Sequence, residues 1–173
     1  PCGIVIANAG AATSAPFARV TPEDWQAMMA VNLTGTFLTF REALARIEGW
    51  GRLIAVASTA GLKGYSYVAH YCAAKHGVVG LVRALAQEVA RTPVTVNALC
   101  PGFLETEMTD RSVATIVDRT GKSVTEARAA LAATNPQRRL IAPAEVAAAA
   151  LWLCATGSEG VNGQAIAIDG GET

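Results

Sequence analysis

The sequence has no apolar run long enough to cross a membrane and no excess of charge of one sign. Its apolar segments all fall short of the roughly 18 residues that a membrane-spanning helix requires. Lysine plus arginine number 14 and aspartate plus glutamate number 14, so the formal net charge is zero. A chain without a basic excess lacks the general electrostatic attraction to nucleic acid. We therefore expect neither a membrane nor a nucleic acid among its partners.

Cysteine and histidine are scarce and scattered. The cysteines are Cys2, Cys72, Cys100 and Cys154, and the histidines are His70 and His76. No Cys-x-x-Cys pair is present, and a spacing of six puts the two histidines on no common helical face, so we expect no metal site. The cysteines are typical of small core residues in a reduced, cytoplasmic protein. His70 could line the substrate cleft, but we expect a partly exposed histidine without a chemical role.

Apolar strand-like segments alternate with longer helical ones. Strands are predicted at residues 3–8, 51–57, 94–100 and 164–168, and helices over about 21–47, 67–91, a short stretch after Ser123, and 143–154. Such alternation indicates an α/β fold with a doubly wound parallel sheet. The 173 residues are enough for a single domain with a sizeable core. Residues 105–140 are the least regular part.

Helix starts and a buried stripe can be named individually. Thr21-Pro22-Glu23-Asp24 has an N-cap threonine followed by proline at the first helical position, and Ser123-Val124-Thr125-Glu126 reads as a capping box. Pro93 is expected to break the helix before it. In the helix from Thr21, the stripe expected to be buried is Trp25, Met28, Met29, Leu33, Phe37, Phe40 and Leu44.

Tyr71 and Lys75 stand four residues apart in a predicted helix, and Ser58 ends an apolar strand upstream. A helix brings such a pair onto one face. A nearby ammonium favours the phenolate and lowers the pKa of the tyrosine, while a serine hydroxyl can donate to a carbonyl or alkoxide oxygen. The three residues together predict a proton-transfer site. Taken singly, the pair is a common helical accident and Ser58 a strand-end cap.

Further segments follow in a fixed order around these three residues. They are Asn8-Ala9-Gly10 after an apolar strand, Asn32 within a helix, Pro101-Gly102 after the third strand with Leu104 and Thr106 beyond it, and Asp169-Gly170-Gly171 near the end. The ordered set resembles the short-chain dehydrogenase/reductase family over nearly all of the chain. The resemblance implies a Rossmann-like fold and an enzyme that transfers a hydride between NAD or NADP and a carbonyl or secondary alcohol.

The resemblance also implies residue roles. Tyr71 would be the general acid or base, Ser58 would hold the substrate oxygen, and Lys75 would lower the pKa of Tyr71 and bind the nicotinamide ribose. Asn32 would hold a water that links Lys75 to solvent. The cofactor would be bordered by Asn8, Ala9, Gly10, Pro101, Gly102, Leu104 and Thr106, together with Tyr71 and Lys75. Residues 105–140 would form a mobile substrate-binding lobe, and Asp169-Gly170-Gly171 would be structural.

Three features depart from the family pattern, and the mildest is Ala7, which stands where many members have a second asparagine. The glycine-rich turn that cradles the dinucleotide pyrophosphate does not precede Asn8. We therefore expect this chain to be the C-terminal two thirds of a longer domain, inactive alone, with residues 4–7 as an apolar strand meant for the inside of a sheet. Arg138 stands where the family often has glycine before Arg139. We expect a solvated pair of charges there, or contact with an acidic group.

The runs around Lys75 and Pro101 look most like reductases of 3-oxoacyl thioesters: 3-hydroxyacyl-CoA dehydrogenases, acyl-carrier-protein reductases and polyketide ketoreductases. Sugar-alcohol, 3-hydroxybutyrate and steroid dehydrogenases stay open, as does a non-catalytic dinucleotide-binding protein. The helix over 67–91 carries apolar residues on more than one side, from Val78 to Val89. We therefore expect a homo-oligomer, a dimer or a tetramer, unless the broad stripe is covered within the chain.

Overall fold

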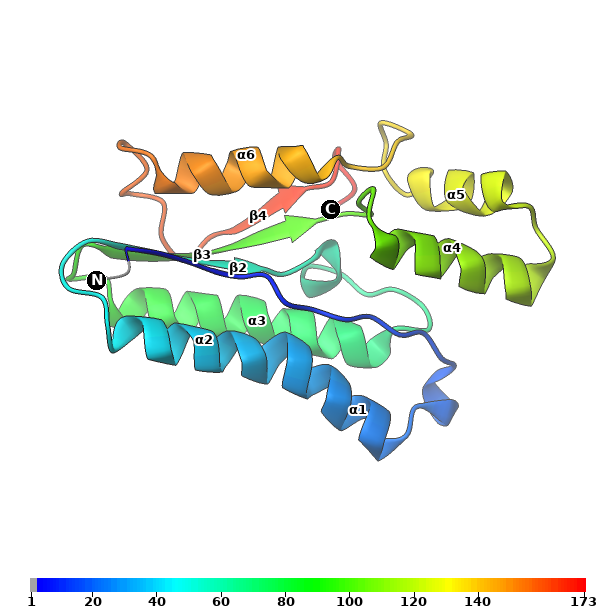
Figure 1. Cartoon of the computed structure of the whole chain (residues 1–173), viewed down its shortest axis with the longest axis horizontal. Helices are drawn as coiled ribbons and strands as arrows, with labels where there is room; N and C mark the ends of the chain where they lie inside the picture. Colours follow the sequence, from blue (N-terminus) through cyan, green and yellow to red (C-terminus); the bar gives the residue numbers. More distant parts are fainter. Residues whose placement is uncertain (1–2) are drawn as a thin grey trace.

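The computed structural model describes residues 3–173, so the prediction for Cys2 lies outside the described residues. It contains a four-stranded sheet in the order β1 (Ile4–Ala7), β2 (Gly51–Val56), β3 (Val94–Pro101) and β4 (Ala165–Ile168). All neighbouring strands are parallel. Helices cover both faces, with α2 and α3 below the sheet and α6 above it in Figure 1. The predicted α/β fold with a doubly wound parallel sheet is confirmed.

Helices begin where the capping residues predict. The helices are α1 (Pro22–Met29), α2 (Gly35–Leu44), α3 (Ala69–Glu88), α4 (Glu107–Thr120), α5 (Val124–Ala132) and α6 (Pro143–Cys154). The Asp24 N–H donates to Thr21 Oγ1 at 3.1 Å, and the Glu126 N–H donates to Ser123 Oγ at 3.2 Å. Both sites are full capping boxes, because the carboxylates accept from the backbone of the cap residues in return.

The structure corrects the description of residues 105–140 as irregular. Most of this stretch is helical, in α4 and α5. The many threonine, serine and aspartate residues of α4 have weak helix propensity, which hid the pattern. Two signals could have revealed it: the spacing of Val113, Ile116 and Val117, and Gly121, which ends α4 with a φ of 69°.

The helix predicted from Thr21 is not one continuous α-helix. A single π-helical turn, Ala30–Thr34, separates α1 from α2. The extra residue shifts the helical phase, so a stripe extrapolated across the turn is misplaced. Beyond the turn, Phe37 is 44% exposed while Phe40 is buried as expected. Before the turn, where no phase shift applies, Met28 is buried as expected and Trp25 is 41% exposed.

The core lies on both faces of β2 and β3. Towards α2 and α3, Leu53 and Val96 pack with Phe40, Val78 and Val82. Towards α6, Ile54 and Leu99 pack with Leu153. This two-sided burial is why both strands read as nearly continuous apolar runs. β1 lies at the sheet edge, and Ile4 and Ile6 are 44% and 46% exposed.

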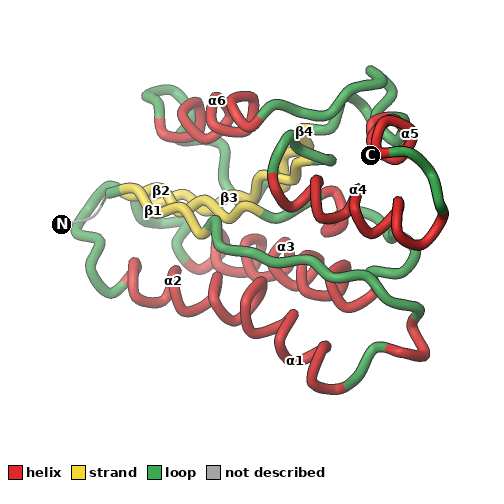
Figure 2. Tube along the Cα trace, turned by 45° about the vertical axis from the view of Figure 1, so that its right-hand side comes forward, coloured by secondary structure: helices red, strands yellow, loops and turns green. Residues whose placement is uncertain are grey.

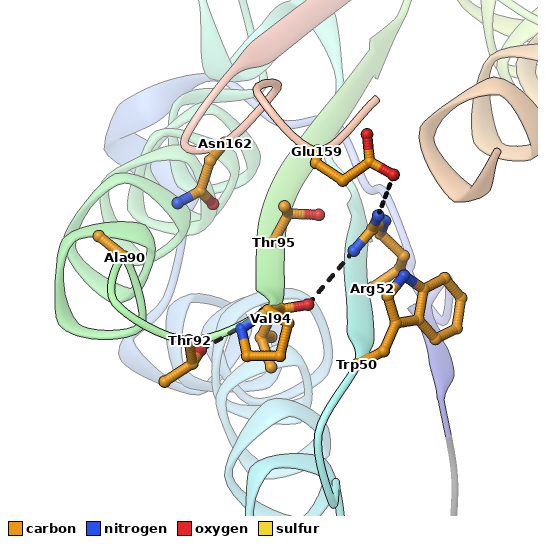
Figure 3. Close-up of a pocket in the computed structure, with 9 residues that line it drawn as sticks. Trp50, Arg52, Ala90, Thr92, Val94, Thr95, Glu159 and Asn162 are labelled. Atoms are coloured by element: carbon orange, nitrogen blue, oxygen red, sulfur yellow. Dashed lines mark hydrogen bonds and ion pairs between the residues drawn. The ribbon is translucent and has the colours of Figure 1, made fainter. Parts of the chain in front are cut away.

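Arg52, at the start of β2, is a fully buried charge within this apolar sheet. Its Nε donates to the Leu153 carbonyl at 3.1 Å and its Nη1 donates to the Gly51 carbonyl at 3.1 Å. The guanidinium lies 4.8 Å from the Trp50 ring centroid and 3.7 Å from Glu159 Oε1, beside a cavity of about 130 Å³ (Figure 3). Arg52 therefore ties β2 to the end of α6 through backbone carbonyls.

Arg52→Ala is expected to lower the free energy of unfolding by about 3 kcal/mol, because it removes buried hydrogen bonds and enlarges the cavity. Glu159→Gln should cost less than about 1 kcal/mol, since the Glu159 side chain is 58% exposed and its ion pair is long. Urea unfolding of both variants measures the difference. Equal, small losses in the two variants would contradict this account of Arg52.

Candidate active site

The candidate site lies where the carboxyl ends of three parallel strands meet. β1 leads into Asn8-Ala9-Gly10, β2 leads to Ser58, and β3 ends at Pro101. These strands lie side by side with α3 beneath them (Figure 2). This edge is where ligands bind in open α/β sheets.

Tyr71 and Ser58 are brought together at this edge. Tyr71 lies in the first turn of α3, and its hydroxyl is near enough to the Ser58 side chain for Ser58 to influence the Tyr71 pKa. The Ser58 oxygen also accepts from the Ala60 N–H at 3.1 Å and so caps the short turn Thr59–Gly61. The ordinary role of a strand-end serine and a contact with Tyr71 therefore coexist, because a hydroxyl can accept and donate at once.

Lys75 lies one helical turn further along α3, with its ammonium buried beneath the site. Its Nζ donates to the Val56 carbonyl at 2.9 Å and lies 5.6 Å from the Tyr71 ring centroid. Burial lowers the pKa of Lys75 to about 8. An ammonium has three donors, so two remain beyond the bond to Val56 for hydroxyl acceptors such as those of a sugar.

The electrostatics of Tyr71 differ from the sequence expectation. Burial raises the pKa of Tyr71, and the hydrogen bond from Ser58 opposes that rise. The expected lowering of the Tyr71 pKa by Lys75 is not found, and the Lys75 ammonium instead donates to the Val56 carbonyl. The phenol is therefore held in its protonated form.

Asn32 is fully buried in the π-helical turn. Its Nδ2 donates to the Ala11 carbonyl at 2.9 Å and to the Met28 carbonyl at 3.1 Å, and its Oδ1 accepts from the Ala11 N–H at 3.3 Å. A methyl group at Gly10 would lie 3.0 Å from Asn32 Oδ1 and 3.5 Å from Lys75 Nζ. Glycine therefore allows the loop after β1 to approach both side chains. The water-holding role of Asn32 stays a prediction.

The remaining predicted cofactor residues border the same edge. Asn8 and Ala9 are exposed after β1, and Pro101 is the buried last residue of β3. The Gly102 N–H donates to the Ile168 carbonyl at 3.1 Å. Beyond it, Leu104 forms an isolated bridge with Ile141, and Thr106 is the N-cap of α4 without a capping side-chain bond. Two open loops, a glycine in each and a buried cation fit a nucleotide bound across the strand ends.

Cys100 is a neighbour of the site that the sequence did not single out. It is fully buried and interacts electrostatically with Lys75. Burial raises the pKa of its thiol to about 11, so the sulfur is neutral. Cys72 is also buried and Cys154 half-buried, and both are free thiols. The position of Cys100 directly before Pro101-Gly102 was the available signal.

The expectation that His70 is partly exposed was wrong. His70 is 1% exposed, and its Nε2 lies 2.9 Å from Thr13 Oγ1. This contact joins the loop after β1 to the start of α3, and a pairing across 57 positions leaves no local signal. Among residues 3–173, no group of three histidine, cysteine, aspartate or glutamate side chains is placed to hold a metal ion. No helix in the same range is long and apolar enough to cross a membrane.

Arg138 and Arg139 are not an equivalent solvated pair. Arg139 forms a two-pronged ion pair with Glu145 at 2.6 and 2.7 Å. Arg138 is exposed and has a φ of 57°, a left-handed conformation that favours glycine. The Asp169 carboxylate accepts from the backbone N–H groups of Gly171 and Thr173, which fits the expected structural role.

Known proteins resemble the chain over nearly its whole length. A family model described as enoyl-(acyl carrier protein) reductase matches residues 2–173. The chain is 37% identical to a D-beta-hydroxybutyrate dehydrogenase of Cupriavidus necator, covering 97% of this chain and 66% of that protein. It is 36% identical to an acetoacetyl-CoA reductase of Rhizobium meliloti, covering 99% of this chain and 68% of that protein.

A solved structure agrees with these sequence matches. A variant of actinorhodin polyketide ketoreductase, crystallised with NADPH, superposes with a TM-score of 0.93 at 36% identity. The match covers 99% of this chain and 67% of that one. The chain thus spans about two thirds of the length of the relatives it matches.

The depressed pKa of Lys75 predicts how stability changes with pH. The unfolded lysine keeps its proton up to its ordinary pKa of 10.5, whereas the folded one loses it near 8. Between these values the unfolded state binds more protons, so stability should rise with pH, by about 2 kcal/mol. In Lys75→Met, this rise should disappear.

Urea unfolding of the cofactor-free protein between pH 7 and 10 measures the effect. Lys122→Met, at an exposed position, is the matched control and should keep the wild-type slope. A Lys75→Met variant that also keeps that slope would show that Lys75 does not titrate in this range.

Proposed function

Because the chain belongs to the short-chain dehydrogenase/reductase family, we propose that the full-length protein is an NAD(P)-dependent oxidoreductase. It transfers a hydride between a nicotinamide cofactor and a carbonyl or secondary alcohol. The observation that carries this proposal is the meeting of Tyr71, Ser58 and Lys75 at the carboxyl ends of the strands. A proton donor, an oxygen-binding hydroxyl and a buried cation are what carbonyl reduction needs beyond the hydride.

Ser58 and Tyr71 handle the substrate oxygen. When bound, the cofactor supplies the hydride to the carbonyl carbon. The Ser58 hydroxyl donates a hydrogen bond to the carbonyl oxygen, and the Tyr71 hydroxyl gives its proton to that oxygen as negative charge develops there. The raised pKa of Tyr71 keeps the phenol protonated at neutral pH, which is the form a general acid requires.

Lys75 and the two loops would hold the cofactor. The donors of the Lys75 ammonium beyond the bond to Val56 suit the ribose hydroxyls. Asn8, Ala9 and Gly10 would lie along the adenosine half, and Pro101, Gly102, Leu104 and Thr106 along the nicotinamide. A relative crystallised with NADPH supports a nicotinamide cofactor, and NAD and NADP both stay open for this protein.

A 3-oxoacyl or 3-hydroxyacyl thioester is the proposed substrate class. An acetoacetyl-CoA reductase and a polyketide ketoreductase among the similar proteins support it. A 3-hydroxybutyrate dehydrogenase is the second candidate, because one relative of that name is 37% identical. Acetoacetyl-CoA and acetoacetate, offered separately with NADH or NADPH, distinguish the two. A protein that binds dinucleotide but turns over neither would instead favour a binding role.

We also propose a cytoplasmic homo-oligomer, a dimer or a tetramer. In α3, Val78, Val79 and Val82 are buried within the chain, so the broad stripe of this helix gives less support than its sequence promised. Better support comes from exposed large apolar residues on other helices, namely Phe37, Leu38, Leu151 and Trp152. Sedimentation of the full-length protein tests this, and a monomer at micromolar concentration would refute it.

Tyr71→Phe is expected to reduce carbonyl reduction by the full-length protein at least a thousandfold, because it removes the proton donor. The dissociation constant for NADPH or NADH should change less than threefold, since the ring and its neighbours remain. Stopped-flow turnover and nicotinamide fluorescence measure the two quantities. Tyr67→Phe changes an exposed phenol, and this comparison variant should lose little activity. Turnover within threefold of wild type in Tyr71→Phe would exclude Tyr71 as the acid.

A further inference from the structure

A buried carboxylate, Glu172, lies just beyond β4 and is not among the residues proposed above for catalysis or cofactor binding. The Glu172 side chain is 4% exposed. Its Oε1 lies 2.6 Å from the Tyr65 hydroxyl oxygen and 3.1 Å from Lys63 Nζ. Lys63 Nζ also donates to the Glu172 backbone carbonyl at 3.2 Å. Glu172 is therefore fixed by two residues of the segment that follows β2.

Tyr65 connects this carboxylate to the turn that starts at Ser58. The Tyr65 hydroxyl oxygen lies 2.7 Å from Thr59 Oγ1, and Thr59 is the residue after Ser58. Burial and the bond to Glu172 both raise the pKa of Tyr65, so the phenol keeps its single proton and donates it to the carboxylate. Thr59 then donates to Tyr65. A continuous chain of hydrogen bonds runs from Glu172 to the residue beside Ser58.

The other face of Glu172 meets the loop after β3. A methyl group at Gly102 would lie 3.3 Å from Glu172 Oε2, which places this oxygen against the Gly102 backbone. The Oε2 atom is buried and has no hydrogen-bond partner among residues 3–173. The Tyr65 ring also meets Phe103 edge-on, with centroids 6.4 Å apart. Glu172 and Tyr65 together thus contact the segment after β2 and the loop after β3, both of which border the candidate active site.

We propose that Glu172 is a positioning residue that holds the loop carrying Ser58 against the loop carrying Gly102. Through Tyr65 it sets the separation between the hydroxyl that binds the substrate oxygen and the loop that borders the nicotinamide. Glu172 follows β4, and its carboxylate contacts both Tyr65 in the segment after β2 and Gly102 in the loop after β3. This proposal rests on the proposed function for its effect on catalysis, but its effect on the loops does not depend on it.

The catalytic consequence follows from geometry. A substrate oxygen and a hydride donor held by two loops react slowly if the loops drift apart, and small misplacements are costly. In the full-length protein, Glu172→Ala should lower kcat/KM for acetoacetyl-CoA at least tenfold. The dissociation constant for NADPH should stay within threefold, because Glu172 serves to space the loops rather than to hold the cofactor. Glu172→Gln keeps an acceptor for Tyr65 and should lose much less activity than Glu172→Ala.

A double-variant cycle separates positioning from general destabilisation. If Glu172 acts through Tyr65, Tyr65→Phe should reproduce most of the loss, and the double variant with Glu172→Ala should be no worse than Glu172→Ala alone. Glu42→Gln is the matched surface control for Glu172→Gln, since Glu42 is half-exposed on α2 and paired with Arg41 and Arg46. Losses that simply multiply in the double variant would refute action through Tyr65.

Amide hydrogen exchange gives a readout that needs no activity. Glu172→Ala should speed exchange at least tenfold in both residues 59–65 and residues 102–104, with α2 unchanged. Faster exchange confined to residues 169–173 would overturn the proposal whatever the enzyme does. Wild-type protein that binds no dinucleotide would instead refute the proposed function and leave this loop contact to be judged by exchange alone.

Discussion

Burying the Lys75 ammonium costs free energy. The end of β2, the loop after β1 and the π-helical turn are all arranged around this buried cation. The lysine is 4% exposed, and its pKa falls because water is excluded from it. The ammonium donates a hydrogen bond to the Val56 carbonyl at the end of β2, so the cation is anchored to the sheet as well as to α3. A ligand that accepts hydrogen bonds from the buried ammonium would offset part of this desolvation cost. Ionisable groups with shifted pKa values are often found at functional sites.

The glycine in the loop after β1 and the π-helical turn between α1 and α2 both lie near Lys75. Gly10 lets the loop after β1 come close to the ammonium, and Asn32 holds that loop through both atoms of its amide. The π-helical turn places Asn32 at this point while interrupting a long helix, a departure that is common at functional positions. Cys100 adds a buried, neutral sulfur that interacts electrostatically with Lys75. The site is thus built from one charge and several neutral neighbours.

What the sequence could predict was local. Each helix cap, at Thr21 and at Ser123, is predicted from four consecutive residues. The strands β2 and β3 are visible in the sequence as apolar runs. Tyr71 and Lys75 share a face because a helix repeats nearly every four residues. The meeting of Ser58 with Tyr71 followed from the parallel sheet, which gathers strand ends at one edge. These features need no knowledge of distant partners.

What it could not predict depends on distant pairings. The bond from Arg52 to Leu153 spans 101 positions and that from Tyr65 to Glu172 spans 107. No pattern within a helix or strand encodes such contacts, so a buried arginine and a buried glutamate read as ordinary surface charges. The direction of the Tyr71 pKa shift could not be predicted for a related reason. The sequence shows the spacing of Tyr71 and Lys75, but it does not show that Tyr71 is buried or that Lys75 donates to the Val56 carbonyl.

The central claim is that the full-length protein moves a hydride from a nicotinamide to a carbonyl carbon beside Tyr71. Its most direct test uses NADPH or NADH carrying deuterium at the transferred position of the nicotinamide, with acetoacetyl-CoA as the acceptor. Mass spectrometry of the product should show a 3-hydroxyacyl thioester that has gained one deuterium at its new carbinol carbon. Product without the label, or no product with any carbonyl compound while the dinucleotide is bound, would contradict the account.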